Sequence, residues 1–139
     1  MVKSYWLLKT EPDEWCWDQQ VESGNMGAEW NGVRNFQAAN NLKKMKIGDN
    51  CFFYHTGKVK SIVGIVKVIK EAFPDKSDKT KKFVSVIVKA LYPLKREVSL
   101  QEIKKNKDFK DFPLVKQSRL SVMQVDLKYW KKIRKMGKV

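Results

Sequence analysis

Three segments rich in β-branched and aromatic residues lie close together in the middle of the chain. They cover residues 50–55, 60–71 and 83–92, and only four residues, which include the turn Thr56-Gly57-Lys58, separate the first two. Consecutive strands joined by short turns imply antiparallel or mixed pairing. Gly64 interrupts the second segment and predicts a bulge or a sharp bend. The middle of the chain is therefore constrained to form a sheet.

Helix signals flank this sheet. Asn35 is placed to cap a helix, Ser99 and Glu102 match a capping box, and Asp126 precedes an amphipathic segment. The other predicted elements are a buried strand over 4–10, a helix over 12–21 that carries Trp15 and Trp17, a loop over 22–29, a helix over 36–46 closed by a left-handed Gly48, a lysine-rich loop over 72–82, a helix over 99–106, a short strand or irregular segment over 118–122 and a helix over 126–137. In 139 residues this order favours a single α+β domain with helices around a small, strongly curved sheet or partial barrel.

The charge balance favours a polyanionic partner. The chain holds 29 Lys and Arg against 15 Asp and Glu, a net charge of +14. No apolar run reaches the roughly 20 residues that span a bilayer, and the apolar side of the last helix (Leu127, Trp130, Ile133) is expected to face the core, so we expect no membrane partner. The candidate phosphate contacts are the lysines of two helices, namely Lys43, Lys44, Lys128, Lys131, Lys132 and Lys135.

The sequence contains no residue pattern typical of a catalytic or metal-binding site. Cys16 and Cys51 are too few for a disulfide framework, and with His55 as the single histidine no zinc-ligand spacing exists. On a strand, Cys51 and His55 would stand about 13 Å apart, too far for a nucleophile and its base. Carboxylates such as Glu11 and Glu14 at a predicted helix start are interpreted as caps. We therefore expect no cofactor, no metal and no enzymatic activity, in a protein of the cytoplasm if the source is bacterial or of the nucleus if it is eukaryotic.

The stretch from Trp30 to Leu42 is the best candidate for a binding site. It combines an indole, a flexible Gly32, a guanidinium at Arg34 and the predicted cap Asn35. Flat heterocycles are held by stacking on aromatic faces and by hydrogen bonds to their edges. Trp30 can equally be a core residue, but its position between a loop and a capped helix favours a role in the wall of a binding pocket. Further candidates are Trp15, Trp17 and Tyr54 for the walls, and Thr10, Asn35, Asn40 and Ser121 for the edges.

Five blocks of the sequence resemble the EVE domain family across nearly the whole chain. They are YWLLKTEP at 5–12, WxGVRNxQA at 30–38 with x for any residue, FFYH at 52–55, IVGI at 62–65 and RLSV at 119–122. The resemblance implies a PUA-like fold, a curved mixed sheet or pseudo-barrel of about five to six strands with surrounding helices, related to the YTH and SRA-type readers. It also implies a single domain over 1–139 that is a non-enzymatic reader of a modified nucleobase, with modified cytosine in DNA as the expected ligand. Separately, we expect the protein to be a monomer.

The resemblance also implies the positions of a base pocket. Carried over block by block, the pocket draws on Lys9, Thr10, Glu11, Trp15, Trp30, Gly32, Val33, Arg34, Asn35, Tyr54, His55, Arg119 and Ser121. One departure is Ala39, which stands where the family often has arginine. Two alternatives stay open: an RNA-binding PUA-type module associated with tRNA or ribosomal RNA, and an enzyme acting on a nucleobase with Glu11 or His55 as base.

Overall fold

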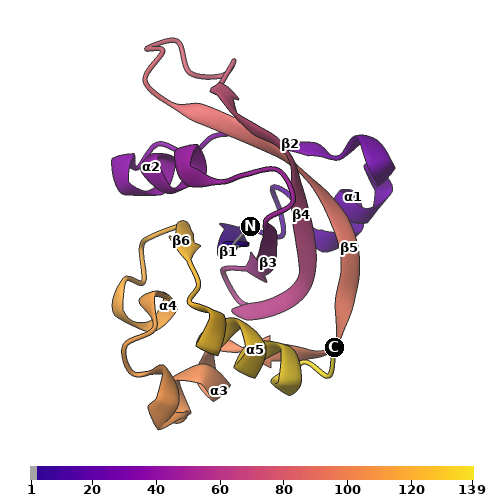
Figure 1. Cartoon of the computed structure of the whole chain (residues 1–139), viewed down its shortest axis with the longest axis vertical. Helices are drawn as coiled ribbons and strands as arrows, with labels where there is room; N and C mark the ends of the chain where they lie inside the picture. Colours follow the sequence, from indigo (N-terminus) through magenta and orange to yellow (C-terminus); the bar gives the residue numbers. More distant parts are fainter. Residues whose placement is uncertain (1–2) are drawn as a thin grey trace.

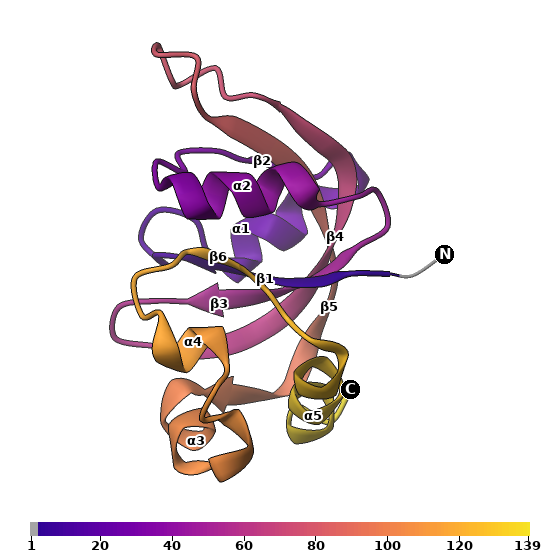
Figure 2. The same ribbon diagram turned by 60° about the vertical axis from the view of Figure 1, so that its left-hand side comes forward.

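One curved sheet of six strands organises the molecule, in the order β2-β5-β4-β3-β1-β6. The computed structural model describes residues 3–139 and is shown in Figures 1 and 2. The elements are β1 (Tyr5–Thr10), α1 (Trp17–Glu22), the 3-10 helix η1 (Gly24–Met26), β2 (Ala28–Trp30), α2 (Phe36–Lys44), β3 (Asn50–His55), β4 (Ser61–Pro74), β5 (Val84–Ser99), α3 (Leu100–Lys105), η2 (Lys107–Phe109), α4 (Pro113–Lys116), β6 (Val122–Gln124) and α5 (Leu127–Met136).

Strand pairing is mixed, as the sequence predicts. β3, β4 and β5 pair antiparallel in succession, whereas β1 pairs in parallel with β3 and antiparallel with β6. The predicted bulge is confirmed, because the β4–β5 register shifts between Ile62 and Gly64. A Cβ atom at Gly64 would lie 2.5 Å from the Trp17 ring, so the absent side chain is what lets α1 pack against this bend.

Aromatic side chains make up much of the hydrophobic core. Trp130 of α5 stacks on Phe52 and on Tyr5, with ring centroids 4.0 and 4.5 Å apart. Trp6 is buried and donates its indole N–H to the Asp49 carboxylate at 3.0 Å. These contacts join the N-terminal strand, the central strands and the last helix into one core.

The first helix begins later than predicted. The predicted start at Pro12 is wrong, because the chain first makes a turn in which the Glu14 and Trp15 amides donate to the Glu11 carbonyl. The helix begins at Trp17, with Cys16 as N-cap and the Gln19 side chain accepting from the Cys16 amide. Cys16 is thus a half-buried capping position, whereas Cys51 is fully buried.

Other boundaries also differ from the predictions. Residues 22–29, predicted as a loop, contain η1 and the start of β2, and the strand predicted over 83–92 continues to Ser99. α2 ends at Lys44 with Met45 as C-cap, because Gly48 belongs to the turn into β3 and its amide donates to the Val68 carbonyl. Strand β4 continues to Pro74, and strand β6 begins at the end of the segment predicted over 118–122.

The capped helices lie where the sequence places them. The Asn35 side chain accepts from the Ala38 amide at 2.9 Å, and Ser99 and Glu102 form their capping box. α5 differs in one respect: Leu127 is 49% exposed, and Tyr129 joins Trp130 and Ile133 on the buried side instead. Within residues 3–139, no helix has the length and apolar character needed to cross a membrane.

Candidate functional site

A cavity of about 830 Å³ opens where the end of β1, the loop between β2 and α2, and the segment before β6 come together. These three segments lie together at the left of Figure 2. The parallel β1–β3 pair and the β1–β6 pair bring them there, because β1 ends between β3 and β6. The cavity is lined by Lys9, Thr10, Glu11, Glu14, Trp15, Ala28, Glu29, Trp30, Asn31, Gly32, Val33, Arg34, Asn35, Thr56, Ser118, Arg119 and Ser121.

Two indoles contribute apolar surface to the cavity. Trp30 is only 7% exposed, and its ring meets Phe53 edge to face at a centroid distance of 5.6 Å. Trp30 therefore packs in the core and also forms part of the cavity wall. Trp15 is half-buried, and its indole N–H donates to the side-chain oxygen of Gln20 at 2.9 Å. Gln20 is itself fully buried and donates to the Val88 carbonyl at 3.0 Å, so the orientation of the Trp15 ring is fixed from behind.

The end of β1 supplies polar groups. The Lys9 ammonium donates to the Ser118 carbonyl at 2.9 Å, and burial lowers the pKa of Lys9. The Thr10 hydroxyl donates to the Trp15 carbonyl at 3.1 Å. The Glu11 carboxylate accepts a hydrogen bond from the Thr56 hydroxyl at 3.1 Å. These contacts tie β1 to the segments on both sides of the cavity.

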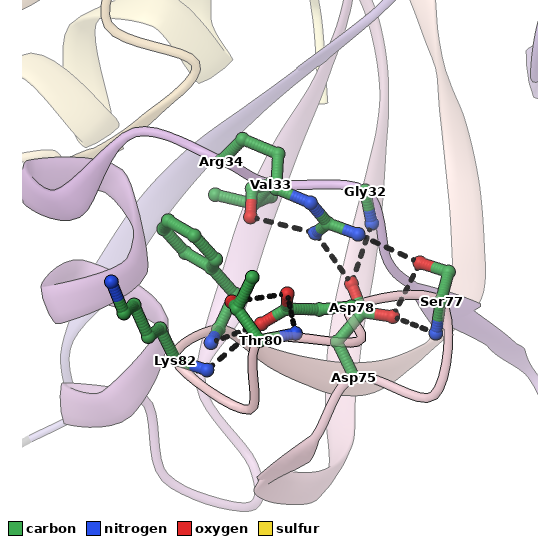
Figure 3. A network of polar contacts seen from close by, with 9 residues as sticks. Gly32, Val33, Arg34, Asp75, Ser77, Asp78, Thr80 and Lys82 are labelled. Carbon is green, nitrogen blue, oxygen red and sulfur yellow. Dashed lines mark hydrogen bonds and ion pairs between the residues drawn. The ribbon is translucent and has the colours of Figure 1, made fainter.

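The β2–α2 loop is held by a carboxylate from a distant part of the chain (Figure 3). Buried Asp75 accepts hydrogen bonds from the Gly32 amide at 2.8 Å and from the Arg34 guanidinium at 3.0 Å. Burial alone would raise the pKa of Asp75, but the hydrogen bonds from Ser77, Gly32 and Arg34 outweigh it and hold the pKa at about 2. Gly32 has φ of +78°, a left-handed conformation that suits glycine and turns its amide toward Asp75.

The cavity lining carries no net charge. Its three cations, Lys9, Arg34 and Arg119, are matched by three carboxylates, and the +14 excess of the chain therefore lies outside the cavity. The carboxylates are Glu11, Glu14 and Glu29. A site of this kind suits a neutral, flat ligand with hydrogen-bonding edges better than it suits a phosphate.

Eleven of the fourteen residues predicted for the pocket line this cavity. The three that do not are Asn40, Tyr54 and His55. Asn40 is exposed on α2, beyond the turn that faces the cavity. Tyr54 is buried on β3, where burial raises its pKa to about 12, and the Lys9 ammonium lies 5.8 Å from its ring centroid. Tyr54 thus lies behind Lys9 and supports it from the core.

His55 stabilises the start of α1. Its Nε2 atom accepts a hydrogen bond from the Trp17 amide at 3.2 Å. Burial lowers the pKa of His55, although Glu97 and Asp18 act in the opposite direction. Among the described residues there is also no group of three or more His, Cys, Asp or Glu side chains that could hold a metal ion.

Six lining residues were not predicted: Glu14, Ala28, Glu29, Asn31, Thr56 and Ser118. Asn31 and Ser118 are sequence neighbours of predicted positions, so an extended motif would have included them. Ala28 and Glu29 belong to β2, which pairs with β5, and no local pattern signals that pairing. Ala39, the departure from the family pattern, is buried in α2 and does not reach the cavity.

The lysines predicted as phosphate contacts lie in two separate places. Lys43 and Lys44 are exposed on the last turn of α2. Lys128, Lys131, Lys132 and Lys135 lie on α5, at the other end of the molecule from the tip of the β4–β5 hairpin (Figure 1). Lys132 is engaged by an ion pair with Asp108.

Comparison with known proteins decides the family. The sequence model described as the EVE domain matches residues 4–136, almost the whole chain. The chain belongs to the EVE domain family. Thymocyte nuclear protein 1 from Rattus norvegicus is 35% identical over 127 residues, which cover 74% of this chain and 56% of that protein. This EVE domain chain therefore spans little more than half of the length of that curated relative.

Solved structures agree with this assignment. The protein Rpa0253 from Rhodopseudomonas palustris is 47% identical, with a TM-score of 0.92 over 97% of this chain and 93% of that one. Human THYN1 protein in complex with 5-methylcytosine containing DNA is 28% identical, with a TM-score of 0.88 over 99% of both chains. A YTH domain from Zygosaccharomyces rouxii, in complex with N6-methyladenosine RNA, shares only 15% identity at a TM-score of 0.59, covering 99% of this chain and 85% of that one. The YTH likeness concerns the fold alone, and with the curved six-stranded sheet it confirms the predicted PUA-like class.

Proposed function

We propose that this EVE domain binds nucleic acid by taking one modified base into the cavity between Trp15 and Trp30. The observation that carries the proposal is the charge-neutral cavity with indole surface and polar edges, set in a chain of net charge +14. A base that leaves the stack is neutral and flat, whereas its phosphates are anionic and stay outside. The neutral cavity thus suits the neutral base, and the positive charge outside the cavity suits the anionic phosphates.

The roles follow from the contacts already described. Trp30 and the fixed ring of Trp15 offer apolar faces to the base, and stacking on an aromatic side chain is worth roughly 1–3 kcal/mol per base. Thr10, Asn35, Ser121 and the backbone near Gly32 supply hydrogen-bonding groups for its edges. Arg119 is exposed at the rim, where a cation can contact the adjoining phosphate.

Modified cytosine in DNA is the ligand we propose first. A protein of the same family, human THYN1, has been solved in complex with 5-methylcytosine containing DNA. Its 28% identity to this chain over 99% of both lengths supports carrying the ligand class across as a proposal. A methyl group adds apolar surface to the base, and an indole wall can bury that surface.

A binding assay with two classes of variant tests this function. Wild type and variants are titrated against labelled DNA oligonucleotides that differ by one 5-methyl group, with an RNA of the same sequence as a third arm. Trp30→Phe keeps apolar packing against Phe53 and reduces the stacking surface, and Trp15→Ala removes the second indole. We expect both variants to lose preference for the methylated oligonucleotide while keeping salt-sensitive binding to any DNA.

Arg119→Gln supplies a surface variant, and Lys104→Gln on α3 is its matched control because both lose one exposed charge. Both variants lose one positive charge, so we expect Arg119→Gln to bind the DNA more weakly than Lys104→Gln does. Equal affinity of the wild type for both oligonucleotides, or preference unchanged in the Trp30 and Trp15 variants, would show that the cavity does not read the base. Tighter binding of the RNA arm would favour the RNA-binding alternative.

A further inference from the structure

The tip of the β4–β5 hairpin is a lysine-rich loop attached to the cavity wall. Residues 75–83 project beyond the sheet on the side of α2 and the β2–α2 loop, as both ribbon views show (Figures 1 and 2). Asp75 at the base of the tip joins it to Gly32 and Arg34, which line the cavity. The tip is therefore fixed relative to the cavity, although more than 40 residues separate them in sequence.

Both carboxylates of the tip point inward. Asp75 accepts from the Ser77 amide and hydroxyl, in addition to Gly32 and Arg34. Asp78 accepts from the Thr80 amide and hydroxyl and from the amides of Lys82 and Phe83, at 2.5 to 2.9 Å. Figure 3 shows this arrangement. The two acids order the loop from within, and its exposed ionic groups are the lysines at 76, 79, 81 and 82.

Phe36 contacts this tip and directly follows Asn35, which lines the cavity. Its side chain is 62% exposed, which is unusual for so large an apolar group, and its ring stacks on Phe83 with centroids 5.0 Å apart and planes 28° apart. The Arg34 guanidinium lies 5.5 Å from the Phe83 ring centroid. Arg34, Phe83 and Phe36 thus form a continuous series of contacts from the cavity wall to the surface. The Phe36 ring is held in one orientation while much of its surface stays free.

We propose that Phe36 and the tip lysines form a second nucleic-acid surface, on which the base next to the one in the cavity stacks on Phe36 and the strand phosphates contact Lys76, Lys79, Lys81 and Lys82. This inference rests on the proposed function, and it assigns the path of the strand outside the cavity. An exposed, supported aromatic ring beside ordered cations is the combination that holds single-stranded nucleic acid without reading its sequence. The tip lysines place cations on a loop that is joined to the cavity wall, whereas the lysines of α5 lie at the other end of the molecule from the tip (Figure 1).

The test compares a single nucleotide with a strand. Wild type, Phe36→Ala and Phe36→Leu are titrated with 5-methyl-2′-deoxycytidine monophosphate and with a single-stranded 9-mer that carries one 5-methylcytosine. The leucine variant keeps an apolar contact with Phe83 and lacks the aromatic face, so it separates stacking from loss of fold. Ile47→Ala, another exposed apolar position near the far end of α2, is the control. We expect both Phe36 variants to bind the mononucleotide as the wild type does and to bind the 9-mer about 5- to 100-fold more weakly.

A second comparison tests the lysines. The tip variant changes Lys76, Lys79, Lys81 and Lys82 to Gln, and the control changes Lys104, Lys105, Lys107 and Lys110 around α3 to Gln, so both lose four charges. The slope of log K against log salt falls by about 0.7 for each phosphate of a single strand that is no longer neutralised by a lysine. We expect the tip variant to reduce this slope by up to about 3 and the control to keep the slope of the wild type.

The outcomes separate this inference from the proposed function. If the wild type prefers the methylated nucleotide, but the Phe36 and tip variants bind the 9-mer as their controls do, the cavity assignment stands and the second surface is overturned. If the wild type shows no preference for the methylated nucleotide or 9-mer over the unmethylated one, the proposed function fails and this inference fails with it. Weaker 9-mer binding in the Phe36 and tip variants alone, with mononucleotide binding unchanged, supports the second surface.

Discussion

Replacing Asp75 by Asn should weaken the connection between the β4–β5 tip and the cavity wall. The carboxylate receives hydrogen bonds from the Gly32 amide, the Arg34 guanidinium and Ser77. An asparagine in the same place offers one acceptor oxygen and directs its NH₂ group at donors that need an acceptor. The variant therefore loses the ion pair and leaves at least one buried donor without a partner.

The pKa of Asp75 sets the size of the effect. A fall from the ordinary 3.8 to about 2 corresponds to at most ~2.4 kcal/mol of folding free energy. Because the Arg34 side chain is 41% exposed and screened by water, we expect a loss of about 1–2 kcal/mol for Asp75→Asn at pH 7. A depressed pKa contributes stability above the unfolded value and loses it as pH falls through the folded value. The difference between wild type and variant should therefore shrink between about pH 4 and pH 2.

Urea unfolding of both proteins at pH 7, 4 and 2.5 measures this difference. Asp111→Asn is the control, because Asp111 also forms an ion pair, with Lys116, but is exposed on the surface. We expect this variant to unfold like the wild type at each pH. A free energy of unfolding for Asp75→Asn equal to that of the wild type at pH 7 would show that Asp75 does not hold the tip to the cavity wall. A difference of the same size at every pH would mean that the carboxylate charge plays no part.

Three further predictions address the fold around the cavity. Gly64→Ala should destabilise the protein by about 1–3 kcal/mol, because its Cβ would lie 2.5 Å from the Trp17 ring, and wild-type stability in urea would mean that α1 packs elsewhere. Gln20→Leu should cost about 1–3 kcal/mol and alter tryptophan fluorescence, because Trp15 loses its acceptor and the Val88 carbonyl its donor; unchanged emission and stability would exclude this support role. His55 should titrate with a pKa below 6.5, because it is partly buried and its Nε2 accepts from the Trp17 amide; the single histidine makes the NMR titration unambiguous, and a midpoint at or above 6.5 would contradict the assignment.

Local patterns in the sequence predicted much of the fold. The caps at Asn35 and Ser99, the strand over 50–55 and the bend at Gly64 are each determined by residues close together in the chain. The start of α1 was missed because Pro12 and the following acids look like a helix start, while the chain there forms a turn closed by the Thr10 hydroxyl. Leu127 was assigned to the core by its spacing, but α5 buries Tyr129 instead.

Part of the candidate site was also predictable from local sequence patterns. Trp30 to Asn35 form one compact motif, and the family resemblance added the end of β1 and the segment before β6. The supports behind the cavity could not be found in this way. Gln20 reaches Val88, and Asp75 reaches Gly32, across 68 and 43 residues of sequence, and no local pattern connects either pair.

Base recognition in the cavity is tested most directly by a crystal structure of the protein with a short DNA that contains one 5-methylcytosine. We predict the methylated base inside the cavity, in contact with Trp15 and Trp30, with the adjoining strand over Phe36 and the lysines of the β4–β5 tip. A methylated base that lies outside the cavity while the DNA is bound elsewhere, for example along α5, would contradict this prediction.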